Sequence, residues 1–188
     1  MFYLAANEPA IGNQSYLNHL PIPDEIMAEN IYSKKVYEDG NYNNVKLMKN
    51  IYRLDYLRKI SRKEIVPNTV LIAAAMHDGG QLFNYLKDDM IKNTETTYYF
   101  KFHPKAKQDF EKIENVNKPN IIAATSSLTY YLSFVSKVIA TQSSVGYEAY
   151  LLGIPVKVVS LPNKINDSPL LDIVGKEPRN MIQVDYIN

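Results

Sequence analysis

The sequence predicts an α/β fold: a Rossmann-like parallel sheet with helices on both faces. Two observations predict it. From residue 70 onward, short runs rich in β-branched and aromatic residues alternate with longer helical patterns, which is typical of parallel strands joined by helices. The strand-like runs also lack strict alternation of apolar and polar residues, as expected where helices cover both faces of a sheet.

The predicted elements follow from local composition, taken in chain order. The strands are apolar or aromatic runs such as VLIAAAM, TYYFKF and KVIAT. The helices have apolar residues at helical spacing, and one of them closes on Gly153 and Pro155. The predicted strands span 70–76, 97–102, 120–124, 137–141, 155–160 and 181–184, and the predicted helices span 81–93, 105–115, 128–137 and 144–152.

The first part of the chain has a different pattern. Residues 1–23 resemble a loop, and residues 24–29, 32–40 and 45–50 then predict one strand–helix–strand unit. One such unit cannot bury both of its faces, so we interpret it as the tail of a preceding α/β lobe. Residues 53–68 would connect it to the rest. We therefore predict two parts, 1–58 as the tail and linker and 59–188 as a nucleotide-binding lobe.

Composition excludes several classes of function. A formal net charge of +1 over 188 residues provides no general attraction for nucleic acid. The absence of cysteine excludes disulfides and thiolate zinc sites, and it fits a reducing compartment. The longest apolar run is too short to cross a bilayer, and the N-terminus lacks the pattern of a secretory signal.

The predicted fold also indicates where a ligand would bind. If the strands from residue 70 have the common order 3-2-1-4-5-6, the order reverses between the first and the fourth strand, and ligands bind there at the carboxyl ends. The loops that leave these two strands are His77-Asp78-Gly79-Gly80 and Gln142-Ser143-Ser144. Both loops begin helices and both contain residues suited to an anion.

Ser143 and Ser144 are the first candidate binding residues. A helix start offers free N–H groups and a partial positive charge, the hydroxyls add donors, and Gly146 would let a phosphate approach the first turn. The alternative is that Ser144 is only an N-cap. Glu148 lies one turn further and could accept from ribose hydroxyls, or it could be a solvated surface residue.

The run KFHPKAK provides the second group of candidates. Lys101, His103 and Lys105 follow one another near the end of a strand, and Pro104 favours an extended backbone at His103. We predict that three cationic groups converge there and that His103 contacts a phosphate or protonates a leaving group. The alternative is a turn histidine with exposed lysines.

The remaining polar groups give weaker signals. Gly79 and Gly80 would let the backbone approach a phosphate or a sugar closely, and Asp78 is either a general base or, as we favour, an N-cap. Thr125-Ser126-Ser127 is expected to cap a helix, with contact to a nucleobase as the alternative. His19 receives no role. The scattered histidines indicate no metal site, and no basic stripe with interleaved aromatics indicates nucleic-acid binding.

At these residues the chain resembles bacterial surface-polysaccharide glycosyltransferases of the two-domain GT-B architecture, most closely the surface carbohydrate biosynthesis proteins. Capsule Kdo transferases, bacterial sialyltransferases and teichoic-acid glycerophosphotransferases share parts of the pattern. The similar segments are KFHPKA, TQSSVGYEAYLLGIPV, the linker-like LPIPDEIMAEN…YEDGNYNNVKLMKNIYRLDYL, and NKINDSPLLD. Together they cover about residue 20 to residue 185.

The resemblance implies that His103 and the pair Ser143 and Ser144 contact the donor's phosphate, with Glu148 near the nucleotide. It also implies a complete first lobe that supplies the catalytic base, and a final helix that crosses back to that lobe. This chain departs from the pattern because only the end of a first lobe is present. We therefore expect its base to lie outside this sequence.

We therefore predict the donor-binding portion of a metal-independent glycosyltransferase, which transfers a sugar from a nucleotide-sugar to a surface glycan acceptor. Its catalytic residue would be His103, and Gly79, Gly80, Lys105, Ser143, Ser144 and Glu148 would bind the donor, without a cofactor or metal. The alternatives are a CDP-glycerol or polyol-phosphate transferase and a non-catalytic nucleotide- or carbohydrate-binding module. We expect a cytoplasmic protein without a transmembrane segment, associated peripherally with the inner face of the membrane.

Overall fold

The computed structural model describes residues 23–49, 52–62, 64–106, 110–163, 168, 170–175 and 181–187. The chain divides into two compact units, with the division between Asp55 and Tyr56. The loop predicted for residues 1–23, with His19, lies outside the described residues apart from Pro23. So do residues 107–109 of the helix predicted from Lys105, and much of the segment NKINDSPLLD.

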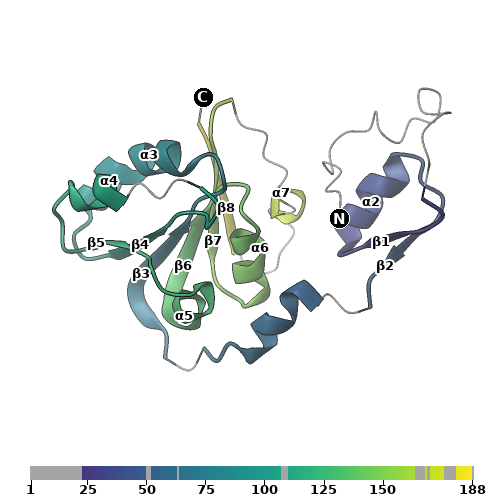
Figure 1. Cartoon of the computed structure of the whole chain (residues 1–188), viewed down its shortest axis with the longest axis horizontal. Coiled ribbons are helices and arrows are strands. Elements are labelled where there is room, and N and C mark those ends of the chain that lie inside the picture. Colours follow the sequence, from purple (N-terminus) through teal and green to yellow (C-terminus); the bar gives the residue numbers. More distant parts are fainter. Residues whose placement is uncertain are drawn as a thin grey trace. The chain divides into compact units, whose positions relative to one another are not determined.

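The first unit contains the predicted strand–helix–strand motif (Figure 1). Strand β1 (Ile26–Ala28) pairs in parallel with β2 (Val45–Leu47), and α2 (Ile31–Asp39) connects them. Asn30 caps α2 by accepting a hydrogen bond from the Ser33 amide at 2.8 Å. The prediction of one parallel β–α–β unit is confirmed.

The second unit is built on a six-stranded parallel sheet. The strands are β3 (Val66–Ala73), β4 (Thr97–Lys101), β5 (Ile121–Ala123), β6 (Val135–Ala140), β7 (Val156–Ser160) and β8 (Ile182–Tyr186). Their order across the sheet is β5-β4-β3-β6-β7-β8, and every pair is parallel. The predicted order 3-2-1-4-5-6 is therefore confirmed, with the reversal between β3 and β6.

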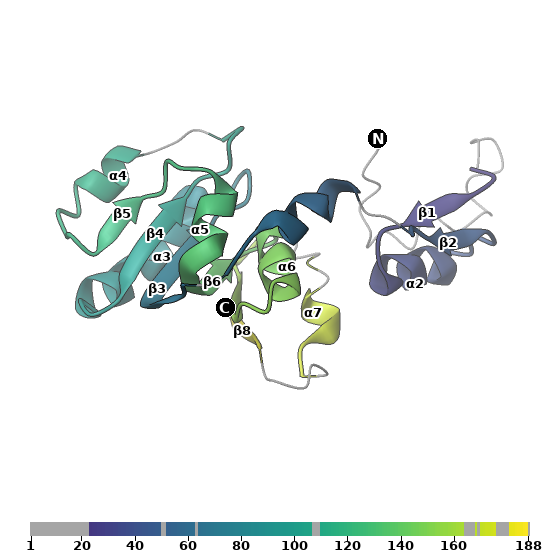
Figure 2. The ribbon, with the colours of Figure 1, turned by 90° about the horizontal axis from the view of Figure 1, so that it is seen from below.

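The helices of this unit run between consecutive strands (Figure 2). They are α3 (Gly79–Lys92), α4 (Phe110–Glu114), α5 (Leu128–Phe134), α6 (Ser144–Leu151) and the short α7 (Leu170–Ile173). A 3₁₀ helix, η1 (Tyr52–Lys59), occupies the start of the predicted connector. No helix in the described part of the chain is both long and apolar enough to cross a membrane.

Two boundaries differ from the sequence prediction. The helix predicted for 128–137 ends at Phe134, and β6 begins at once with Val135. Strand β3 begins at Val66 rather than at Val70, through an irregular stretch in its pairing with β6. In both places, pairing between the central strands β3 and β6 overrides the local pattern, because Val66 pairs with Val135 and the ladder satisfies their backbone groups.

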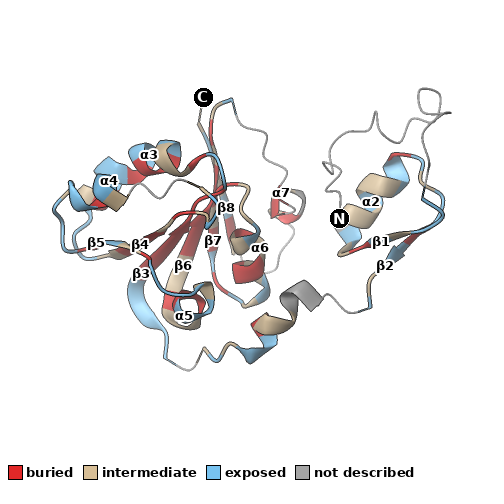
Figure 3. Ribbon diagram, in the orientation of Figure 1, coloured by how far each residue is buried: buried red, intermediate tan, exposed pale blue. Residues whose placement is uncertain are grey.

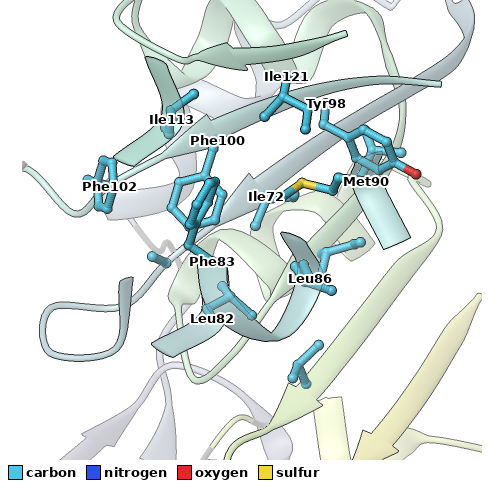
Figure 4. Close-up of a cluster of buried hydrophobic side chains, with 14 of the residues drawn as sticks. Ile72, Leu82, Phe83, Leu86, Met90, Tyr98, Phe100, Phe102, Ile113 and Ile121 are labelled. Atoms are coloured by element: carbon cyan, nitrogen blue, oxygen red, sulfur yellow. The ribbon is translucent and has the colours of Figure 1, made fainter. Parts of the chain in front are cut away.

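Helices pack on both faces of the sheet, and the strands between them are largely buried (Figure 3). On one face, α3 and α4 cover β3, β4 and β5, and the core there is aromatic and aliphatic (Figure 4). On the other face, rings of Tyr131 and Phe134 from α5 contact Tyr99 of β4. The predicted Rossmann-like layering is confirmed.

Candidate functional site

The loops after β3 and β6 meet at the carboxyl edge of the sheet. Thr141, the residue after β6, donates a side-chain hydrogen bond to Oδ2 of Asp78, which follows β3. This bond joins the two loops that the sequence predicted to flank the crevice, at the point where the strand order reverses. Sequence reasoning did not single out Thr141.

Asp78 is the most unusual polar residue of this edge. Its side chain is only 3% exposed, and its second oxygen, Oδ1, is buried without a hydrogen-bond partner among the described residues. Asp78 occupies the N-cap position of α3, but its side chain makes no capping hydrogen bond. The favoured N-cap position is therefore confirmed, but the carboxylate accepts a hydrogen bond from Thr141 instead of capping the helix.

The start of α6 is capped by Ser143 rather than by Ser144. The Ser143 hydroxyl accepts a long hydrogen bond of 3.4 Å from the Val145 amide, and the Gly146 amide donates to the Ser143 carbonyl at 3.1 Å. Ser144 is the first residue of the helix, and it is exposed. The alternative in which Ser144 is only an N-cap is corrected by one residue, and the exposed residue at this helix start is Ser144.

Two of the three glycines serve packing. A Cβ at Gly146 would lie 3.2 Å from Leu170 Cδ1 and 3.3 Å from Ala140 Cβ, so this glycine faces the interior and not a ligand. A Cβ at Gly79 would lie 2.8 Å from the Phe102 ring. At Gly80, the nearest atom is the Lys112 ammonium, at 3.1 Å. Lys112 of α4 is thus a cation close to the start of α3 that the sequence did not reveal.

Glu148 is buried and is not the solvated surface residue that was the alternative. The residue is only 5% exposed, and its Oε2 atom accepts a hydrogen bond from the hydroxyl of Tyr56 in η1. Close by in the chain, the Arg62 guanidinium donates to the carbonyls of Leu132 and Val135. These bonds hold Tyr56 and Arg62, which precede β3, against the rest of the second unit.

Replacing Tyr56 with phenylalanine should lower the free energy of unfolding by about 1 to 2 kcal/mol, because a buried carboxylate oxygen loses its donor. Urea denaturation followed by circular dichroism measures the change. Tyr130→Phe is the matched control, because Tyr130 is exposed and the same atom is removed. Equal stability of the two variants would show that the bond contributes nothing.

His103 lies just past β4, and the conformation of its loop fixes its tautomer. The Lys105 amide donates to Nδ1 of His103 at 3.2 Å. In the neutral ring, Nδ1 is then the acceptor and the proton resides on Nε2. The side chain is half-buried rather than enclosed in the core. His103 can therefore present an N–H donor at the edge of the sheet.

The three predicted cationic groups, Lys101, His103 and Lys105, do not all converge. The Lys101 ammonium donates to the carbonyls of Ser126 at 2.7 Å and Ala124 at 3.3 Å, and it lies 5.6 Å from the ring centre of Tyr131. Burial lowers the pKa of Lys101. Lys101 thus ties β4 to the loop before α5, whereas Lys105 is exposed next to His103.

The edge brings together a defined set of groups. Strand β3 lies between β4 and β6, and two inter-strand spacings of about 4.8 Å put the ends of β4 and β6 roughly 10 Å apart. His103 and the Ser143–Ser144 helix start therefore lie at the same edge, on either side of Asp78. This arrangement can hold an extended ligand whose phosphate and polar groups are separated by several bonds.

Two further predictions concern caps and metals. Ser127 caps α5 by accepting from the Tyr130 amide at 3.3 Å, so the capping prediction for Thr125-Ser126-Ser127 is confirmed. Within the described ranges, no group of three or more histidine, aspartate or glutamate side chains could hold a metal ion. No protein-family model and no curated protein matches the chain.

Proposed function

We propose that the second unit is the donor-binding portion of a glycosyltransferase that transfers a sugar from a nucleotide-sugar to a surface glycan. The observation that supports this most is the hydrogen bond between Thr141 and Asp78. It shows that the two loops at the reversal of strand order are in contact, where parallel α/β sheets bind ligands. The family resemblance of KFHPKA and TQSSVGYEAYLLGIPV supports the same function.

The proposed chemistry is displacement at the anomeric carbon, with a nucleotide phosphate as the leaving group. The start of α6 and the Ser144 hydroxyl would hold the phosphate through hydrogen bonds and the helix dipole. His103, with its proton on Nε2, would donate to the phosphate oxygen on which charge grows, and Lys105 would add positive charge. These groups would stabilise the negative charge on the leaving phosphate, as a divalent cation does in metal-dependent transferases.

Glu148 would act indirectly in this proposal. A ribose contact requires an accessible carboxylate, but the Glu148 carboxylate is buried and bonded to Tyr56. We propose Glu148 as a positioning residue, which holds the first turns of α6 against η1. Gly79 would likewise let the start of α3 pack close to Phe102. Gly80 lies beside the Lys112 ammonium and would be the one of the two glycines near a donor phosphate.

The Ser143→Ala/Ser144→Ala variant should bind the preferred nucleotide about 1 to 3 kcal/mol more weakly, because two hydroxyl donors are lost. The experiment first screens CMP, CDP, UDP and GDP by thermal shift and then measures the best one by calorimetry. Asn30→Ala is the control for a lost helix cap, since Asn30 caps α2 in the other unit. It should leave nucleotide affinity unchanged.

Equal affinity of the double variant and the original chain would remove the assignment of this helix start. Binding of CDP with turnover of CDP-glycerol, when a first lobe is supplied, would favour the polyol-phosphate alternative. Binding without turnover of any donor would favour a non-catalytic module. In this proposal, another lobe would supply the catalytic base and hold most of the acceptor. The protein would act in the cytoplasm, at the inner face of the membrane.

A further inference from the structure

A groove lies at the opposite end of the sheet from the proposed donor site. Its volume is about 770 Å³, within the range of small-molecule sites. It runs between the C-terminal half of α3 and the first residues of β3, β4, β6 and β7. It is therefore formed by the amino-terminal parts of the strands, and it shares no residue with the edge described above.

The floor of the groove is apolar. Val70, Ile139 and Tyr98 line it from three neighbouring strands, and Met90 lines it from α3. Tyr98, Met90 and Leu86 form one end of the core cluster that fills the space under α3 (Figure 4). The groove thus begins at the end of α3, where this helix stops covering the face of the sheet. An apolar group placed there would extend the existing core.

The rim of the groove is cationic. Lys137 of β6 and Lys157 of β7 stand on the same face, since Lys137 is two residues from Ile139 and Ile139 pairs with Lys157. Lys157 forms an ion pair with Asp185 at 2.5 Å. Lys137 donates a hydrogen bond to the neutral Gln183 side chain at 3.2 Å, and it forms no ion pair with any residue that the structure describes. Lys92, at the end of α3, adds a third ammonium to the lining, and Asp89 adds one carboxylate.

Lys137 is the unusual member of this rim, because it is a half-buried lysine on a central strand. Burial lowers the pKa of Lys137 most, the charge of Lys157 lowers it further, and Asp185 acts in the opposite direction. An anion beside Lys137 would relieve both effects, since opposite charge favours the protonated amine. The site therefore has the charge pattern of a place for a ligand of negative charge.

The backbone at the rim is also specialised. Asn68 lines the groove with a positive φ of 54°, which is uncommon for a residue other than glycine. It lies in the irregular stretch between Val66 and Val70, where the register of β3 on β6 shifts. Such bulges often redirect a side chain near functional sites. Here the irregular stretch places Asn68 in the lining of the groove.

We propose that this groove binds a small amphiphilic anion, with its phosphate or carboxylate head between Lys137 and Lys157 and its apolar body on the floor of Val70, Met90, Tyr98 and Ile139. The site is independent of the donor site, because it lies at the other end of the strands. Its ligand differs in kind from a nucleotide, since the floor offers hydrophobic contact and the rim offers charge.

The test uses hexyl phosphate as the probe, with hexanoate and inorganic phosphate for comparison. Hexyl phosphate should shift the backbone amide resonances of Ser136–Val138 and of Lys157 in ¹H–¹⁵N spectra, and calorimetry gives its Kd. Lys137→Met, which keeps the aliphatic stem, should weaken binding about tenfold. Lys87→Met is the matched control, because Lys87 is exposed on α3 outside the lining, and it should bind as tightly as the original chain.

Inorganic phosphate should bind at least tenfold more weakly than hexyl phosphate, because it gains nothing from the apolar floor. Equal binding of the two phosphates would overturn the proposal, as would unchanged affinity of Lys137→Met or shifts centred on Ser143 and Ser144. Hexanoate distinguishes a carboxylate from a phosphate preference. The spectra of the original chain decide the location even if the Lys137 variant folds poorly.

Discussion

Replacing Phe100 with alanine should lower the free energy of unfolding of the second unit by about 3 to 5 kcal/mol. Phe100 is fully buried at 0% exposure on β4, in the core cluster beneath α3. Its ring meets Phe83 edge-on at 5.3 Å between centroids and lies 4.9 Å from Phe102. The loss removes both ring contacts and leaves a cavity beneath α3, which the surrounding sheet is too rigid to fill. Urea denaturation followed by circular dichroism measures the change.

Ile122→Ala is the control for this experiment. Ile122 lies on the neighbouring strand β5 but is 39% exposed, so its truncation should cost much less. The native stability of a domain is about 5 to 15 kcal/mol, so the Phe100 variant approaches the limit of folding. A Phe100 variant no less stable than the Ile122 variant would mean that the cluster under α3 is not the core of this unit.

Replacing Gly146 with valine should destabilise the second unit by about 3 kcal/mol, at the upper end of the usual cost of overpacking. The new Cβ would meet Leu170, Ala140 and Val156 at 3.2 to 3.6 Å, and two methyl groups would follow it into the same space. Because Ala140 and Val156 belong to the sheet, α6 must move instead. The helix start that carries Ser144 would move with it, so nucleotide affinity should fall together with thermal stability.

Gly153→Ala separates overpacking from backbone strain. Gly153 has a φ of +73° but open space around its Cβ position, so alanine should cost only about 1 kcal/mol. Nucleotide affinity should then be unchanged. If Gly146→Val is as stable as Gly153→Ala, α6 can shift freely, and its close contact with the sheet has no role in placing the helix start.

The fold was predictable because strand and helix patterns alternate along the chain with short loops between them. That alternation implies a parallel sheet, and the order 3-2-1-4-5-6 followed from the commonest winding. The boundary at Val135 was not predictable, because LTYYLSFVSK continues a helical pattern while β3 recruits Val135 into the sheet. Only a partner about 70 residues away in the sequence decides between helix and strand there.

The candidate site was predictable as a pair of loops, but not as a set of contacts. Thr141 bonds a residue 63 positions earlier, and Tyr56 bonds one 92 positions later, and neither residue has a local pattern that indicates its partner. Glu148 illustrates the difference. Its spacing from Ser144 indicated a neighbouring ligand contact, whereas burial against η1 decides what the carboxylate does.

The groove was not visible in the sequence for a related reason. Lys137 and Lys157 read as polar interruptions in two apolar strands, which commonly mark exposed positions. They become neighbours only because β6 and β7 are adjacent, and both are half-buried within the folded sheet. Charge clustering across strands requires the register, and the register comes from the folded sheet.

The pairing of β3 with β6 has a consequence for biosynthesis. Strand β3 ends at Ala73 and its central partner begins only at Val135, so a ribosome must add about 60 residues before the sheet can close. At 5 to 20 residues per second this takes roughly 3 to 12 s. Throughout that interval the nascent chain exposes an apolar strand edge, and it is then that a holdase chaperone would protect it from aggregation.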